Sequence, residues 1–160
     1  SLALRRALLH ELAEEAAEAG RELTEAARLD PGVPPVPRLD GGAFERLVED
    51  AIEALPEPFR GRLEEVAVVV EPVPSAALAS AAPDDTPPDA LGLFVGHSDL
   101  ERASESGGSP GPVIYLYQRN LERVVTDEKE LAEQVRITLL HEFGHLLGFD
   151  EDGVDAMGLA

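Results

Sequence analysis

Apolar residues recur with a helical period in some stretches of this chain and form short continuous runs in others. Spacings of three and four residues, typical of amphipathic helices, occur in residues 2–29, 43–55 and 127–148. Short runs rich in β-branched or aromatic residues, typical of strands, occur at residues 66–70, 91–95 and 113–117. The pattern therefore predicts three helices and three strands.

The N-terminal helix, residues 2–29, carries only a narrow apolar stripe. The stripe consists of Leu9, Leu12, Ala16, Ala19, Leu23 and Ala26. Its second half, with Pro31 behind it, also resembles the second helix of a tetratricopeptide repeat, although the first half fits that repeat badly. One such repeat cannot bury its own apolar face. We therefore expect this helix to contact a protein partner or a second copy, or to dock on the main domain.

Residues 30–42 contain four prolines and are expected to form a semi-stiff linker. This linker divides the chain into a helical extension, residues 1–29, and a main domain, residues 43–160. Within the main domain, residues 72–90 and 96–110 show no period and are expected to be loops.

The charge balance limits the classes of partner. The chain has 32 Asp and Glu against 13 Lys and Arg, for a formal net charge of -19. With so few cations to neutralise phosphates, we expect no nucleic-acid partner. No apolar run is long enough to cross a bilayer and no signal peptide is visible, so we expect a cytoplasmic protein without membrane contact. Cysteine is absent, so a metal site must use His, carboxylates and water.

The last predicted helix has clear signals at both ends. Asp127 is a favourable N-cap, and Glu130 three residues later completes a capping-box pattern. Gly148 is the expected stop, because glycine readily adopts the left-handed conformation that follows a helix. We therefore expect a helix of about 30 Å that crosses the domain.

This helix contains the motif His-Glu-x-x-His at residues 141–145. At about 100° per residue, His141 and His145 lie roughly 40° apart around the axis and one turn apart along it. Both imidazoles can then reach one metal ion, with the Glu142 carboxylate beside them. Two solvent-facing histidines on a surface helix are the alternative, but the surrounding apolar residues leave little solvent face. These residues are Leu139, Leu140, Phe143, Leu146 and Leu147.

A catalytic zinc usually has three protein ligands and one open position. Acidic residues follow directly after Gly148, and a glycine turn can bring one of them back over the metal. The pattern H-E-x-x-H-x-x-G-x-x-[H/D] places its third ligand ten residues after the first histidine, which here is Glu151. Asp150 and Asp152 flank this position and remain alternatives, and carboxylates that do not bind the metal can orient the imidazoles.

Several segments together resemble a family of small zincin-type metallopeptidase domains found in bacteria. They are residues 44–63 (F-E-R-L-V-E-D-A-I-E-A-L-P-E-P-F-R-G-R-L), residues 66–70, Leu91-Gly92-Leu93-Phe94 with Gly96 and Glu101-Arg102, residues 113–117 and residues 131–148. The resemblance implies an α+β, zincin-like fold with a small sheet beside the metal helix. It also implies a zinc cofactor held by His141, His145 and a carboxylate. The family usually has Asp where this chain has Glu151.

The expected activity is zinc-dependent hydrolysis of a peptide or protein substrate. Zinc polarises the scissile carbonyl and lowers the pKa of water to about 7, and Glu142 takes the proton as general base. We expect residues 113–117 to be an edge strand that binds an extended peptide, with Tyr115 and Tyr117 as substrate-binding candidates. The alternative is a catalytically weak or inactive zincin-like module that binds metal and serves protein interaction.

Overall fold

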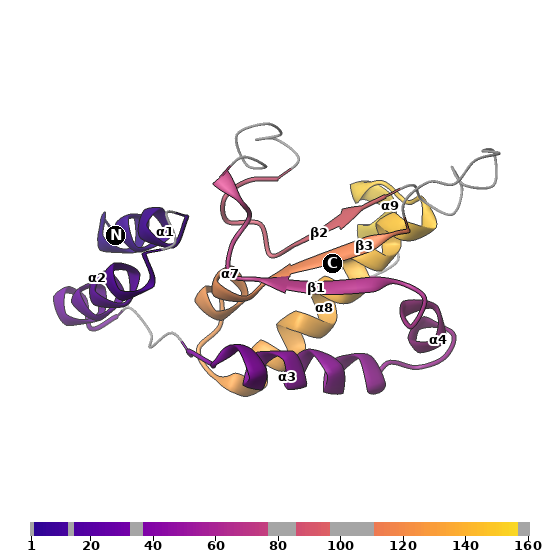
Figure 1. The fold of residues 1–160 in the computed structure, drawn as a ribbon, viewed down its shortest axis with the longest axis horizontal. Helices are drawn as coiled ribbons and strands as arrows, with labels where there is room; N and C mark the ends of the chain where they lie inside the picture. Colours follow the sequence, from indigo (N-terminus) through magenta and orange to yellow (C-terminus); the bar gives the residue numbers. More distant parts are fainter. Residues whose placement is uncertain (1, 13–14, 33–36, 77–85, 97–110, 157–160) are drawn as a thin grey trace.

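The computed structural model describes residues 2–12, 15–32, 37–76, 86–96 and 111–156 (Figure 1). The helices are α1 (Leu2–Leu12), α2 (Ala16–Leu29), α3 (Gly41–Glu53), α4 (Phe59–Leu63), α7 (Gln118–Arg123), α8 (Glu128–Leu147) and α9 (Glu151–Ala156). The strands are β1 (Ala67–Glu71), β2 (Gly92–Val95) and β3 (Val113–Tyr117). The fold is α+β, as predicted, with a three-stranded mixed sheet.

The single helix predicted for residues 2–29 is wrong. Helix α1 ends at Leu12 and α2 begins at Ala16, and Glu15 directly before α2 has a non-helical φ of -94° and ψ of 65°. The two helices pack against each other through small side chains, because Ala3, Ala7, Ala19 and Ala26 are all buried. Figure 1 shows this pair at one end of the molecule, apart from the sheet. No Gly or Pro precedes Glu15 in residues 2–14, so the sequence carried no signal for the break.

Helix α3 begins inside the segment expected to be linker. The Asp40 side chain accepts a hydrogen bond from Ala43 N at 2.9 Å, so Gly41 and Gly42 form its first turn. The apolar face of α3 is buried through Phe44, Leu47 and Val48. Together with α8 it covers one face of the sheet (Figure 1).

The sheet has the strand order β1-β3-β2, with β1 parallel and β2 antiparallel to β3. The three strands lie within one residue of the predicted runs. The prediction that residues 113–117 form an edge strand is wrong, because β3 pairs on both sides. Among the described residues, β1 and β2 are the edges. Composition identified β3 as a strand, but its place in the order depends on long-range pairing that a single run of residues does not encode.

The two faces of β3 have different surroundings. Ile114 and Leu116 are fully buried and belong to the main core with α3 and α8. Because side chains alternate along a strand, Tyr115 and Tyr117 lie on the opposite face, where their rings stack with centroids 6.4 Å apart. Tyr117 is fully buried. Burial, reinforced by the negative charge of Glu71, raises the pKa of the Tyr117 phenol to about 12.

Helix α8 has the predicted bounds. The Asp127 side chain accepts from Glu130 N at 2.8 Å, and Gly148 adopts a left-handed φ of 98°. The Glu130 carboxylate instead accepts hydrogen bonds from the backbone N and the hydroxyl of Thr126, so only half of the predicted capping box forms. No helix in the described ranges is both long and apolar enough to cross a membrane.

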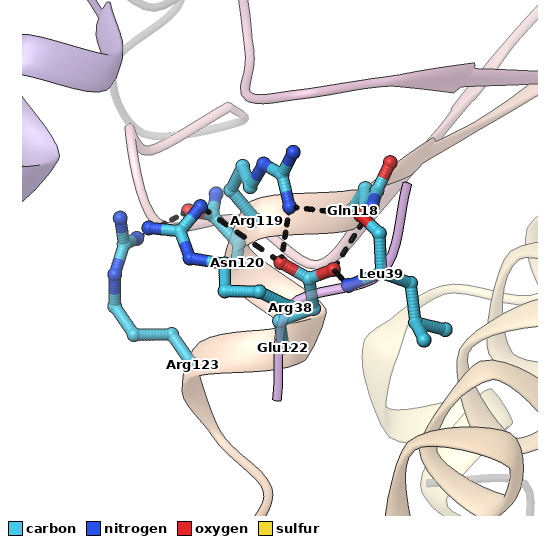
Figure 2. Close-up of polar contacts among 7 residues, drawn as sticks. All are labelled: Arg38, Leu39, Gln118, Arg119, Asn120, Glu122 and Arg123. Carbon is cyan, nitrogen blue, oxygen red and sulfur yellow. Dashed lines mark hydrogen bonds and ion pairs between the residues drawn. The ribbon is translucent and has the colours of Figure 1, made fainter. Parts of the chain in front are cut away.

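A short helix that the sequence pattern missed, α7, follows β3 directly. Its Glu122 carboxylate is fully buried and binds the end of the linker (Figure 2). It accepts hydrogen bonds from Leu39 N at 3.0 Å, Gln118 Nε2 at 2.9 Å and Arg119 Nη1 at 2.7 Å. Arg38 Nη1 lies 3.9 Å from Oε2 of the same carboxylate. A buried carboxylate requires such partners, and here they attach residues 38–39 to the main domain.

Asn120 in the same helix binds the segment that leads into β2. Its Nδ2 donates to Pro88 O at 2.9 Å and to Ala90 O at 2.8 Å, while its Oδ1 accepts from Arg123. The Arg119 backbone N also donates to Pro72 O at 2.9 Å, just beyond β1. One turn and a half of helix therefore fixes the linker, the exit of β1 and the entry of β2.

We expect Glu122→Ala to lower the free energy of unfolding by about 3 kcal/mol, because it removes the buried acceptor of the Leu39 N–H, the Gln118 amide and the partly buried Arg119 guanidinium. Glu133→Ala is the matched control, since Glu133 pairs with Arg136 three residues away on an exposed face, and it should cost less than about 1 kcal/mol. Urea unfolding measures both. Equal losses would show that the buried cluster contributes no more than a surface pair.

The Tyr117 hydroxyl is buried without a hydrogen-bond partner among the described residues, so Tyr117→Phe should leave stability at neutral pH unchanged or raise it by about 1 kcal/mol. A tyrosine in the unfolded chain ionises near pH 10, whereas folded Tyr117 keeps its proton up to about pH 12. Stability of the wild type should therefore fall between these two pH values.

The Tyr117→Phe variant should lose less stability over that alkaline range, as followed by urea unfolding at several pH values. Tyr115→Phe, which removes only the hydroxyl of the stacked neighbour and keeps Tyr117, should still lose stability over this range because burial is the main cause of the Tyr117 shift. An identical alkaline loss in the wild type and in Tyr117→Phe would contradict the assignment.

Candidate metal centre

His141 and His145 lie one turn apart on α8 and turn their rings toward each other. Their Nε2 atoms are 3.2 Å apart, and the ring planes cross at 77°. Two nitrogens that bind one tetrahedral zinc at 2.0–2.1 Å are separated by about 3.3 Å. The pair therefore has the spacing that a shared metal ion requires.

The turn after α8 fixes the orientation of the His145 ring. Its Nδ1 lies 3.0 Å from the carbonyl oxygen of Phe149. A carbonyl can only accept a hydrogen bond, so the proton of neutral His145 sits on Nδ1 and Nε2 acts as the acceptor or ligand. The left-handed Gly148 reverses the chain here, with Phe149 N donating to Gly144 O at 3.1 Å. The helix stop and the imidazole orientation thus depend on the same glycine.

Glu142 points away from solvent toward β2. Its side chain is buried, and Oε2 accepts a hydrogen bond from Phe94 N at 2.8 Å. Its Oε1 lies against Gly92, where a Cβ atom would come within 3.1 Å of it. The carboxylate follows His141 directly in the sequence, so a base is held beside the two imidazoles.

The acidic residues after Gly148 are only partly defined. Asp150 Oδ1 accepts from Gly153 N at 2.9 Å, so Asp150 begins α9 as its cap. Asp150 and Asp152 are both exposed. The side chain of Glu151 lies outside the described residues. Within the described part of the chain, no three His, Asp or Glu side chains converge on one point suited to a metal, and the third ligand stays a prediction.

The substrate-binding role of Tyr115 and Tyr117 stays a prediction. Both lie on the face of the sheet opposite Ile114 and Leu116. Tyr117 is fully buried, and burial raises its pKa, with a contribution from the negative charge of Glu142. The edge that lies next to Glu142 belongs to β2. The contact of Gly92 and Phe94 with Glu142 was not expected from the sequence, although a glycine inside a strand often marks a close approach of another group.

Comparison with known families agrees with this geometry. A family model described as Zincin-like metallopeptidase matches residues 63–159, which is more than half of the chain and includes all three strands and α7 to α9. A search of curated proteins finds no match. With a capped helix carrying two convergent histidines and a buried glutamate beside a small mixed sheet, the chain belongs to the zincin-like metallopeptidase family.

Proposed function

We propose that this protein is a zinc-dependent peptidase. His141 and His145 would hold the metal with a carboxylate from the turn after Gly148, and Glu142 would act as general base. The observation that carries this proposal is the 3.2 Å separation of the two Nε2 atoms together with the Phe149 carbonyl on His145 Nδ1. A hydrogen bond from the second ring nitrogen to a carbonyl oxygen is a usual means of orienting a zinc-binding imidazole.

Zinc supplies Lewis-acid chemistry, which polarises a peptide carbonyl and lowers the pKa of water to about 7. The chain contributes the proton transfer. Glu142 would accept the proton of the attacking water and return it to the leaving amine. Its burial against β2 removes rotamer freedom, so the carboxylate is held in place before the substrate arrives.

The edge of β2, which pairs with no further strand among the described residues, is the surface that best fits an extended peptide. Because Tyr117 N donates to Leu91 O, the antiparallel ladder alternates so that the N–H groups of Gly92 and Phe94 point away from β3. The Phe94 N–H already binds Glu142 Oε2 at 2.8 Å, so a peptide added along this edge would pair at Gly92 and pass close to Glu142. The substrate edge is therefore β2 and not, as the sequence suggested, residues 113–117.

The pair α1–α2 supports a second, compatible role in protein interaction. Leu9 and Leu29 are 64% and 63% exposed. A partner or a second copy that covers these two side chains would remove their apolar surface from water. In the alternative function, this interaction is the main activity and the metal site only stabilises the fold.

With zinc bound, Glu142→Gln should keep the metal and lose about 10²–10⁴-fold in kcat on a peptide library, because it removes the base and keeps the size of the side chain. Glu133→Gln on the exposed face of α8 is the control and should cleave as the wild type does. Metal content by mass spectrometry and turnover by fluorogenic peptides measure the two properties.

Equal turnover of the wild type and Glu142→Gln would rule out the general-base role. Wild-type protein that binds one zinc per chain and cleaves no peptide in a broad library would favour the interaction module.

Among the acidic residues of the turn, Glu151→Ala should weaken zinc binding most, by about a hundredfold or more, because it removes a direct ligand. Asp150→Asn keeps the α9 cap, since Asn caps as well as Asp, and should change affinity by a smaller factor, as should Asp152→Ala. Competition with a chromogenic chelator gives the zinc Kd of each variant. A larger loss in either aspartate variant would transfer the ligand role to that residue.

A further inference from the structure

The Glu142 carboxylate is packed against a strand rather than against other side chains of its own helix. It is 7% exposed, and a buried carboxylate is stable only where donors meet it. One donor is the backbone N of Phe94 in β2, at 2.8 Å from Oε2. Because backbone N–H groups do not rotate as side chains do, this donor defines where one oxygen of Glu142 lies.

The Phe94 N–H can serve Glu142 because the sheet does not use it. In the antiparallel pair of β2 and β3, the hydrogen bond from Tyr117 N to Leu91 O identifies the hydrogen-bonded positions. Hydrogen-bonded positions recur at every second residue from Leu91. The backbone N–H and C=O groups of Gly92 and Phe94 lie between these positions and face away from β3. Glu142 therefore accepts a hydrogen bond from a backbone N–H that faces away from β3, and the hydrogen bonds between β2 and β3 stay intact.

Gly92 makes the close approach of the second oxygen possible. A Cβ atom at this position would lie 2.7 Å from Thr138 Cγ2, 3.0 Å from the Tyr115 carbonyl oxygen and 3.1 Å from Glu142 Oε1. The backbone of Gly92 is not in the left-handed region, so its conformation does not by itself require glycine. The requirement is space between β2 and α8, on the side where Glu142 sits.

We propose that Gly92 and Phe94 are positioning residues for Glu142. Gly92 admits Oε1 against the strand, and the Phe94 N–H binds Oε2, so that β2 sets the orientation of the carboxylate. This inference rests on the proposed function only in calling Glu142 the general base. The contact itself is a property of the metal-free protein and can be measured without catalysis.

The first test is a double-mutant cycle by urea unfolding of the metal-free protein. Gly92→Ala is made with Glu142 present and with Glu142→Ala, in both cases in the Thr138→Ser background, which lacks the methyl group nearest to the new Cβ. The contact with the Tyr115 carbonyl is the same in both arms and cancels. We expect the drop in urea midpoint caused by Gly92→Ala to be clearly smaller when Glu142 is truncated. Equal drops in both backgrounds would overturn the proposal.

A second arm removes the donor. Phe94→Pro lacks the N–H, whereas Phe94→Ala keeps it, and both lose the aromatic ring. Because this N–H faces outward, proline removes no ladder hydrogen bond. The midpoint of the Pro variant should lie below that of the Ala variant when Glu142 is present, and the gap should narrow with Glu142→Ala. An unchanged gap would contradict the role of the N–H.

The catalytic readout separates positioning from folding. Gly92→Ala should bind one zinc per chain and lose about tenfold to a hundredfold in kcat, since a small displacement of a catalytic group is costly. When Gly92→Ala is added to Glu142→Gln, kcat should fall no further. Gly111→Ala, where a Cβ meets open space, should retain the wild-type kcat. A wild type without peptidase activity contradicts the proposed function, whereas equal midpoint drops in the urea cycle contradict the positioning role. The two failures are thus distinct.

Discussion

Helix α8 must be buried and polar at the same time, and the rest of the domain is arranged around this constraint. Leu131, Val135, Leu139 and Leu146 are fully buried in the core formed with α3 and the sheet. One turn of the same helix carries two histidines and a glutamate. A polar group in such a place is stable only with a fixed partner. For Glu142 and His145 the partners include backbone groups from outside the helix, the Phe94 N–H and the Phe149 carbonyl, which makes the site depend on the surrounding fold.

The two backbone partners come from elements with different anchors. The Phe149 carbonyl is held by the left-handed turn at Gly148, a local feature of α8. The Phe94 N–H belongs to β2, whose entry is fixed by the Asn120 side chain in α7. The buried Glu122 in α7 also binds Leu39 at the end of the linker. Through α7, the same polar cluster connects the end of the linker to the strand that contacts Glu142.

The limits of sequence reasoning follow from this division. Local signals were sufficient for α8, since Asp127 and Gly148 mark its ends, and for the three strands, which have short β-branched or aromatic runs. The approach of the His141 and His145 rings needed only helical geometry. The central position of β3, the helix α7 and the contact of Gly92 with Glu142 depend on pairing and packing between distant segments. The break at Glu15 lies in a run of good helix formers, so propensity alone predicts a continuous helix there.

The turn after α8 also bears on the choice of the third ligand. Asp150 Oδ1 already accepts from Gly153 N, and this bond caps α9. Ligation through the same oxygen would remove the cap, at a cost of about 1 kcal/mol. The capping bond therefore argues against Asp150 Oδ1 as a metal ligand, through the stability of α9 rather than through the motif spacing.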